Sequence, residues 1–310
     1  MAAHPELMKL PGVESGAGVS VVAPASFARP ERIEGGTARL QALGFAPRFM
    51  PNAMARGPLF FAGTPEQRIA DLHQAFVDPS SQAVMSVRGG YGSNHILRYV
   101  DVDLVRAHPK PFLAYSDLTG LQLVLLDRLG LPAFHGPMLA ADFFLEDGVH
   151  LDSFYAALAG AAYEVGPAQG LRVIKPGVAS GILYGGCLSI LVSLLGTPWE
   201  PDTRNRLLFV EDVGAKPYQI DRMLWQLRVA GKLEGVTGIV FGEMLDCASP
   251  GAEPDLLEKV IASALADFDG PIALGLRSGH VSRDNVTLTF GVEAELLASD
   301  EAHLRIGARN

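Results

Sequence analysis

The stretch PFLAYSDLTGLQLVLLDRLG, residues 111–130, combines a short apolar run, a polar turn and a long apolar segment. The run Pro111–Tyr115 has the length and composition of a buried strand. Leu118–Leu129 is apolar along most of its length and predicts a helix. A second strand-like run, Leu131–Phe134, follows. Two strands joined by a helix predict a right-handed crossover within a parallel sheet.

The same alternation fills the chain on the N-terminal side of this stretch. Strands are expected at Val19–Val22 and Ala83–Val87, and helices from about Pro30 to Leu43 and from Pro65 onward. Thr64 precedes that second helix and Gln67 follows three residues later, which is the pattern of a capping box. We therefore expect a mainly parallel α/β sheet.

Near residue 140 the alternation stops, and turn-rich segments follow. Strand patterns resume in the second half of the chain at Leu207–Val210, Val236–Phe241, Ile272–Leu274 and Val286–Phe290. A chain of 310 residues is long enough for two cores. The sequence therefore predicts an N-terminal domain over 1–140, a connection over 141–180 and a C-terminal domain over 181–310.

The composition excludes several classes of function. The formal charge is −9 with both signs mixed along the chain, which argues against a nucleic-acid partner. The most apolar stretch, Gly181 to Leu195, is too short for a membrane span. Because no apolar segment follows a basic start at the N-terminus, a cytoplasmic location is expected. The two cysteines, Cys187 and Cys247, lack CxxC spacing, so we expect no disulfide framework, no metal and no cofactor.

A glycine-rich segment, Arg88-Gly89-Gly90-Tyr91-Gly92, follows the expected strand Ala83–Val87. Glycines let backbone N–H groups approach a ligand closely, although the segment fits a plain tight turn equally well. A dinucleotide fingerprint needs a further glycine at the position of His95. This departure weighs against a nucleotide-dependent oxidoreductase.

Ser116 lies between a strand and a helix, as the nucleophile of an elbow motif does. The glycines that usually flank such a serine are missing here. A serine before a helix is also a common N-cap, and spacing alone leaves both interpretations open.

Further candidates lie beyond other strand ends. Glu211 and Asp212 follow Leu207–Val210, where a carboxylate orients a catalytic histidine or caps a turn. His135 and His280 both lie in glycine-flanked loops near strand ends, and either fits the role of general base.

Taken together and in order, these segments resemble the LD-carboxypeptidases, a family that includes the microcin C immunity peptidases. The resemblance covers roughly Val19 to Leu297. It is carried by residues 86–92 (SVRGGYG), 115–119 (YSDLT), 134–137 (FHGP), 185–186 (GG), 208–212 (LFVED), 218–222 (YQIDR) and 279–280 (GH).

The resemblance implies Ser116 as nucleophile, His280 as general base and Glu211 as its orienting carboxylate. It also implies that the backbone N–H groups of Gly90 and Asp117 form the oxyanion hole. The fold implied is a Rossmann- or flavodoxin-like parallel-sheet domain followed by a mixed α/β domain. The active site would lie in the cleft between them.

The activity implied is that of a serine carboxypeptidase that releases a terminal D-amino acid, D-alanine, from muropeptides in cell-wall recycling. The resemblance also implies a homodimer. The alternatives are an immunity-type peptidase that cleaves an acyl-adenylate, and a catalytically silent binding protein of the same fold.

Arg88 and Tyr91 are the candidate substrate contacts. Arg88, next to the expected oxyanion loop, either binds a terminal carboxylate or only braces that loop. An adenylate would instead need an aromatic platform, for which Tyr184 and Trp199 are the nearest residues. One departure from the family concerns Cys187, which stands where asparagine is usual and is expected to pack beneath a helix start.

Overall fold

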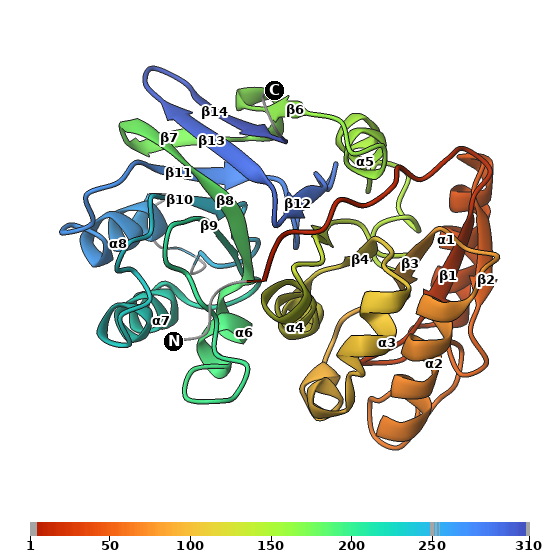
Figure 1. The fold of residues 1–310 in the computed structure, drawn as a ribbon. Helices are drawn as coiled ribbons and strands as arrows, with labels where there is room; N and C mark the ends of the chain where they lie inside the picture. Colours follow the sequence, from red (N-terminus) through yellow and green to blue (C-terminus); the bar gives the residue numbers. More distant parts are fainter. Residues whose placement is uncertain (1–4, 249–250, 252, 254, 308–310) are drawn as a thin grey trace.

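The computed structural model describes residues 5–248, 251, 253 and 255–307. Two β-sheets form separate lobes, and helix α4 (Thr119–Leu129) lies between them (Figure 1). No helix in the described part of the chain is long and apolar enough to cross a membrane.

The first sheet is built around parallel strands from the N-terminal half. Their order is β5-β4-β3-β1-β2, with β12 added antiparallel to β5 at one edge. The bounds are β1 (Gly18–Val22), β2 (Ala46–Phe49), β3 (Ala83–Ser86), β4 (Phe112–Ala114), β5 (Ala133–His135) and β12 (Leu288–Phe290). The parallel order 2-1-3-4-5 is that of flavodoxin-like folds, which confirms the predicted fold class.

Helices connect these strands as the sequence pattern indicates. They are α1 (Pro30–Ala42), α2 (Pro65–Val77), α3 (Val102–Ala107) and α4, with 3₁₀ turns η1 (Ser93–His95), η2 (Leu97–Tyr99) and η3 (Ser116–Leu118). The capping box at α2 is formed: the Gln67 amide N–H donates to the Thr64 hydroxyl, and the Thr64 N–H donates to Gln67 Oε1.

The second sheet is mixed. Its order is β6-β14-β13-β8-β9-β10-β11-β7, in which β8 to β11 are parallel and the outer strands are antiparallel. The bounds are β6 (Tyr163–Val165), β7 (Arg172–Lys175), β8 (Gly177–Cys187), β9 (Arg206–Glu211), β10 (Gly238–Gly242), β11 (Ile272–Leu276), β13 (Glu293–Ala298) and β14 (Ala302–Ile306). The helices that accompany it are α5 (Leu151–Leu158), η4 (Pro167–Gln169), α6 (Leu188–Ser193), α7 (Pro217–Val229) and α8 (Leu256–Ala264).

Two features of these sheets differ from a simple division along the sequence. Strands β6 and β7 fall within the segment 141–180, yet both belong to the second sheet. Strand β12, from near the C-terminus, belongs to the first sheet. The chain therefore crosses between the lobes again after the C-terminal sheet has begun.

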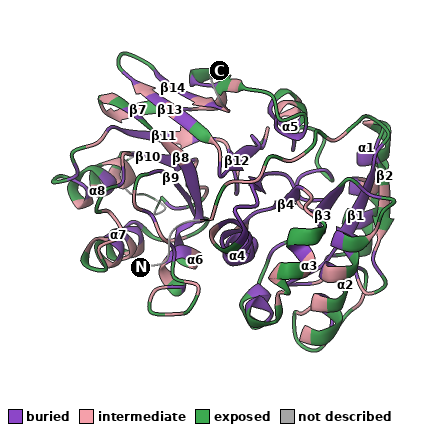
Figure 2. Ribbon diagram, in the orientation of Figure 1, coloured by how far each residue is buried: buried purple, intermediate pink, exposed green. Residues whose placement is uncertain are grey.

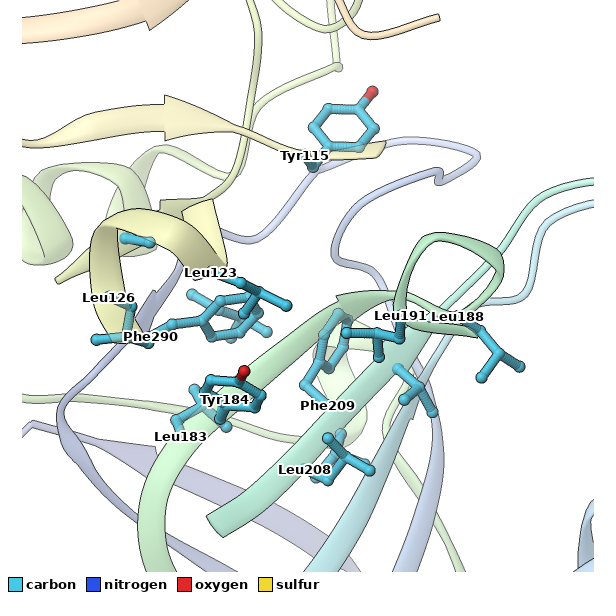
Figure 3. Close-up of a cluster of buried hydrophobic side chains, with 14 of the residues drawn as sticks. Tyr115, Leu123, Leu126, Leu183, Tyr184, Leu188, Leu191, Leu208, Phe209 and Phe290 are labelled. Atoms are coloured by element: carbon cyan, nitrogen blue, oxygen red, sulfur yellow. The ribbon is translucent and has the colours of Figure 1, made fainter. Parts of the chain in front are cut away.

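Helix α4 joins the two lobes through a shared core. Residues Leu121, Leu123, Leu125 and Leu126 are all nearly inaccessible, so the helix is buried on several faces (Figure 2). Figure 3 shows Leu123 and Leu126 close to Leu183 and Tyr184 of β8, with Phe209 and Phe290 in the same cluster. The Tyr184 hydroxyl also donates to Asp127 of α4 at 2.7 Å. The apolar side chains of α4 thus hold the two lobes together.

The strand order fixes where a ligand can bind. In an open parallel sheet, ligands bind beyond the carboxyl ends of the strands, at the point where the strand order reverses. Here the reversal lies between β1 and β3, which are neighbours in the sheet. The loops that follow β1 and β3 carry Arg29 and Arg88, and the turn after β4 carries Ser116.

Candidate active site

Ser116 has a backbone conformation that its sequence does not reveal. Its φ is +67°, in the left-handed region that L-residues other than asparagine and aspartate seldom adopt. Such strain costs on the order of 1–3 kcal/mol and is concentrated at functional sites. No side chain caps η3 or α4, so Ser116 is not an N-cap. The strained turn instead has the conformation of a nucleophile elbow.

A glycine makes this elbow sterically feasible. A Cβ atom at position 89 would lie 2.9 Å from the Ser116 Cβ and 3.1 Å from its Oγ. The next residue, Gly90, has φ +94°, and a Cβ there would lie 2.5 Å from the Ser26 hydroxyl. A side chain at either position would collide with a neighbouring serine, so both glycines are required by the packing of the loop itself.

Buried polar contacts hold the glycine loop against the elbow. The Ser93 N–H donates to the Asp117 carboxylate at 2.8 Å, and the Ser93 hydroxyl donates to the Asp117 carbonyl at 2.6 Å. The buried Arg68 donates to the Gly92 carbonyl at 2.7 Å. Within the described residues, the Gly90 N–H donates to no protein group.

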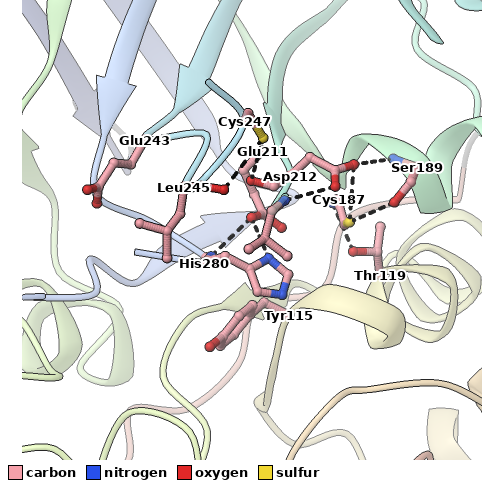
Figure 4. Close-up of polar contacts among 12 residues, drawn as sticks. Tyr115, Thr119, Cys187, Ser189, Glu211, Asp212, Glu243, Leu245, Cys247 and His280 are labelled. Atoms are coloured by element: carbon pink, nitrogen blue, oxygen red, sulfur yellow. Dashed lines mark hydrogen bonds and ion pairs between the residues drawn. The ribbon is translucent and has the colours of Figure 1, made fainter. Parts of the chain in front are cut away.

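Glu211 and His280 come from the second sheet and form a hydrogen-bonded pair (Figure 4). Glu211 is the last residue of β9 and is fully buried. Its Oε2 accepts from His280 Nδ1 at 2.8 Å and from the His280 backbone N–H at 3.0 Å. Gly279, with φ +89°, brings the loop this close, because a Cβ there would lie 2.6 Å from the Glu211 carboxyl carbon.

This pair has shifted acidities. Burial disfavours the charged imidazole, but the charge and hydrogen bond of Glu211 outweigh it and raise the pKa of His280. Burial also disfavours the Glu211 carboxylate, and the His280 charge and hydrogen bonds outweigh it, so the pKa of Glu211 is lowered. Glu211 is therefore an anion that stabilises the imidazolium form of its partner.

A cavity of about 600 Å³ brings the two lobes' residues together. Ser116, Gly89 and Gly90 from the first lobe line it, together with His280 from the second. The ring of Tyr115 meets the ring of His280 edge-to-face, with centroids 5.1 Å apart. A serine hydroxyl, an imidazole oriented by a carboxylate and a glycine loop are the components of nucleophilic acyl transfer.

The structure places the two histidines, which local sequence pattern alone left equivalent, in different environments. His135 is fully buried at the end of β5, between the rings of Tyr115, Phe209 and Phe290. Burial lowers the pKa of His135 to about 4. His280, and not His135, lines the cavity with Ser116.

The remaining candidates lie in different places. Arg88 lines the cavity, whereas Tyr91 is 44% exposed and contacts the rings of Phe60, Phe61 and His95. The aromatic residues considered as a platform do not meet at the cavity: Tyr184 is in the core, and Trp199 packs half-buried against it.

Cys187 is buried directly before α6, near the Glu211 carboxylate (Figure 4). Its sulfur lies 3.3 Å from the Ser189 hydroxyl and 3.8 Å from an Asp212 oxygen. Burial, with Glu211 and Asp212 nearby, raises the pKa of the Cys187 thiol well above its usual value. Such an environment is typical of a cysteine that packs in the interior. No cluster of three or more potential metal ligands occurs among the described residues.

Sequence reasoning missed Asp142, Asn285, Arg29 and Arg32. Arg29, the residue before α1, and Arg32, in the first turn of α1, both line the cavity. Asn285 hydrogen-bonds both Asp142 and Gly279, the residue before His280. No local pattern marks these residues, because their partners lie far away along the chain.

Comparisons with known proteins identify the family of this chain. The model of the LD-carboxypeptidase N-terminal domain matches residues 19–136, and that of the C-terminal domain matches residues 180–296. A probable murein peptide carboxypeptidase of Bacillus subtilis is 37% identical over 297 residues, covering 91% of this chain and 89% of that protein.

Solved structures agree on the fold. A muramoyltetrapeptide carboxypeptidase from Oxalobacter formigenes superposes with a TM-score of 0.84 at 27% identity, covering 94% of this chain and 99% of that one. An MccF-like protein from Bacillus anthracis superposes with a TM-score of 0.88 at 27% identity, covering 97% and 100%. With both domain models matched and relatives similar over almost the whole length, this chain belongs to the LD-carboxypeptidase family of peptidases.

Proposed function

We propose that this carboxypeptidase is a serine enzyme that hydrolyses an L,D-peptide bond and releases a terminal D-amino acid from muropeptides. One observation carries the proposal. Ser116, which has a strained backbone and caps no helix, lines the same cavity as His280, and His280 is hydrogen-bonded to the buried carboxylate of Glu211. The names of the Bacillus and Oxalobacter relatives support a murein-derived peptide as substrate.

In the proposed mechanism, His280 Nε2 removes the Ser116 hydroxyl proton as Oγ attacks the scissile carbonyl carbon. Glu211 stabilises the imidazolium that forms and fixes the tautomer with a proton on Nδ1. The N–H groups of Gly90 and Asp117 receive the oxyanion. His280 then returns the proton to the departing amine, and a water repeats the sequence on the acyl-enzyme.

Arg88 is the proposed contact for the terminal carboxylate of the substrate. It lines the cavity beside the glycine loop, and its guanidinium donates to the Phe27 carbonyl at 3.3 Å. That contact uses one of five N–H donors and leaves the others for a carboxylate. Tyr91 remains a weaker candidate because it contributes to the aromatic cluster described above.

The test compares three substrates: a muramoyl tetrapeptide ending in D-alanine, its L-alanine epimer, and aspartyl sulfamoyl adenosine. We expect release of D-alanine from the first, little release from the second and slow or no cleavage of the third. Fast cleavage of the adenosine compound without cleavage of the tetrapeptide would establish the immunity-type activity instead. No turnover of any substrate, with tight binding, would indicate a silent binding protein.

Assembly and location are also proposed from the family. We infer a homodimer in the cytoplasm, where cell-wall peptides are recycled. Light scattering on the purified chain tests the first point, with a monomer mass as the contrary result. Fractionation of the host cell tests the second, with recovery outside the cytoplasm as the contrary result.

A further inference from the structure

Three arginines and a histidine line the active-site cavity. Arg29, Arg32 and Arg88 contribute three guanidinium groups, beside the imidazole of His280. None of the described residues that line the cavity is an aspartate or a glutamate. The whole chain carries a formal charge of −9, so this concentration of positive charge is local. A cavity of this kind attracts an anionic ligand.

The three arginines come from two separate elements. Arg88 follows β3, next to the glycine loop. Arg29 is the N-cap residue of α1 and Arg32 lies three positions later, so these two share one side of the helix start. The N-terminus of a helix adds a partial positive charge at the same place. Arg29 and Arg32 therefore line the same cavity as Arg88 but from a different element of the first lobe.

The guanidinium groups of Arg29 and Arg32 are available to a ligand. Both residues are exposed, and neither forms an ion pair with a carboxylate in the described part of the chain. The Arg32 guanidinium stacks over the Phe144 ring at 5.3 Å, which restricts its position and leaves its N–H edge free to donate. A stacked arginine is well suited to bind a carboxylate through two parallel hydrogen bonds.

We propose that Arg29 and Arg32 form a second anion subsite, which binds a substrate carboxylate other than the terminal one. The inference rests on the proposed function, in which Arg88 already binds the terminal carboxylate. The substrate class is then an acidic peptide: a peptide with at least one free carboxylate in addition to its C-terminus. A neutral peptide with the same scissile bond should be a poor substrate.

The test uses two tetrapeptides that share the terminal D-alanine and the scissile bond. One carries its internal carboxylates free, and in the other they are carboxamides. For the unaltered enzyme we expect kcat/KM to be at least about 10-fold higher on the free acid, mainly through KM, because a contact present before and during reaction changes binding alone. The preference should weaken as salt is raised, since the subsite is exposed.

In the Arg29→Gln/Arg32→Gln double variant, KM for the free acid should rise toward that for the carboxamide peptide. Arg222→Gln is the matched control: Arg222 is also an exposed helical arginine stacked over a ring, that of Tyr218 at 5.6 Å, but on α7 away from the cavity. The control should keep the full preference. An unchanged preference in the double variant, or an equal loss on both peptides, would overturn the subsite.

Failure of the proposed function gives a different result. If the unaltered enzyme cleaves neither peptide, calorimetry on the Ser116→Ala variant still compares binding of the free acid, the carboxamide peptide and a nucleoside monophosphate. Tighter binding of the free acid that Arg29→Gln/Arg32→Gln abolishes supports the subsite. Binding of the monophosphate alone, lost in the same variant, would show a phosphate site and overturn the acidic-peptide assignment.

Discussion

The side-chain amide of Asn285 donates to Asp142 at 2.9 Å, and this contact ties the His280 loop to the other lobe. Asn285 also exchanges two hydrogen bonds with Gly279, accepting its N–H at 3.0 Å and donating to its carbonyl at 3.1 Å. Asp142 in turn accepts from the Tyr115 hydroxyl and from the Met138 N–H. The position of His280 therefore depends on a buried network that reaches the residue next to Ser116.

Asn285→Ala should lower kcat by about 10–100-fold with little change in KM, because a misplaced general base costs rate more than binding. The variant also leaves the Gly279 N–H and carbonyl without partners and removes one of three hydrogen bonds to Asp142, at about 1–3 kcal/mol of unfolding free energy. Steady-state kinetics and thermal melting measure the two effects.

Asn52→Ala is the matched control for that change. Asn52 makes a similar side-chain bond, to Asp71 at 2.8 Å, but neither residue lines the cavity. It should lose stability and keep kcat. Equal kcat in both variants would show that Asn285 serves stability alone.

Ser116→Ala should reduce kcat on the order of 10⁶-fold, as loss of a catalytic nucleophile does. Its stability should change little, since Ser116 caps no helix. Ser116→Gly should be equally inactive and more stable by about 1 kcal/mol, because glycine adopts φ +67° without strain. Turnover and melting temperature decide the matter. An alanine variant with near-normal turnover would show that Ser116 is not the nucleophile.

The pH dependence should report His280. As a base it acts in the neutral form, so kcat/KM should rise with pH and level off above a pKa that lies higher than 6.5. Glu211→Gln removes the negative charge that favours the imidazolium, so burial dominates and the apparent pKa should fall. Rate–pH profiles of both proteins test the direction of this shift. If the apparent pKa of the kcat/KM profile is the same in Glu211→Gln, a group other than His280 controls the pH dependence.

His135→Ala should act on stability and not on the chemical step. The imidazole is enclosed by aromatic rings, and its removal leaves a cavity that costs about 2–5 kcal/mol by analogy with other large-to-small changes. His280→Ala should match the defect of Ser116→Ala, and the double variant should be scarcely worse. Measuring turnover below the melting temperature of each variant separates the effects. The roles are exchanged if His135→Ala is the folded, inactive protein.

Local sequence signals predicted local structure well. The Thr64 capping box is formed, and the alternation of strands and helices in the N-terminal half gave the flavodoxin-like sheet. The pairing of β12 with β5 could not be predicted, because the two strands are about 150 residues apart and neither carries a signal for its partner. The short strands β6 and β7 lie in a turn-rich segment and also pair with distant strands, so they could not be predicted either.

The site was predictable only as an ordered set of motifs. Ser116, Glu211 and His280 each have an ordinary alternative role, and only the resemblance singled them out. What the sequence could not show is geometric: the positive φ of Ser116, the burial of His135 and the bond between Asn285 and Asp142. Such features depend on contacts between distant segments.

Gly89→Ala tests the elbow without changing the identity of Ser116, Glu211 or His280. Its Cβ would lie 2.9 Å from the Ser116 Cβ, too close for two real carbon atoms, so the glycine loop or Ser116 must shift. A displacement of this kind should lower kcat by about 100-fold, since catalytic geometry tolerates little error.

Gly120→Ala is the control: it lies in α4, four residues from Ser116, and its Cβ would meet nothing closer than 3.4 Å. That variant should keep kcat and gain up to about 1 kcal/mol of stability from alanine's helix propensity. Near-normal kcat in Gly89→Ala would show that the loop yields without moving Ser116, and that the close approach at position 89 is not required for catalysis.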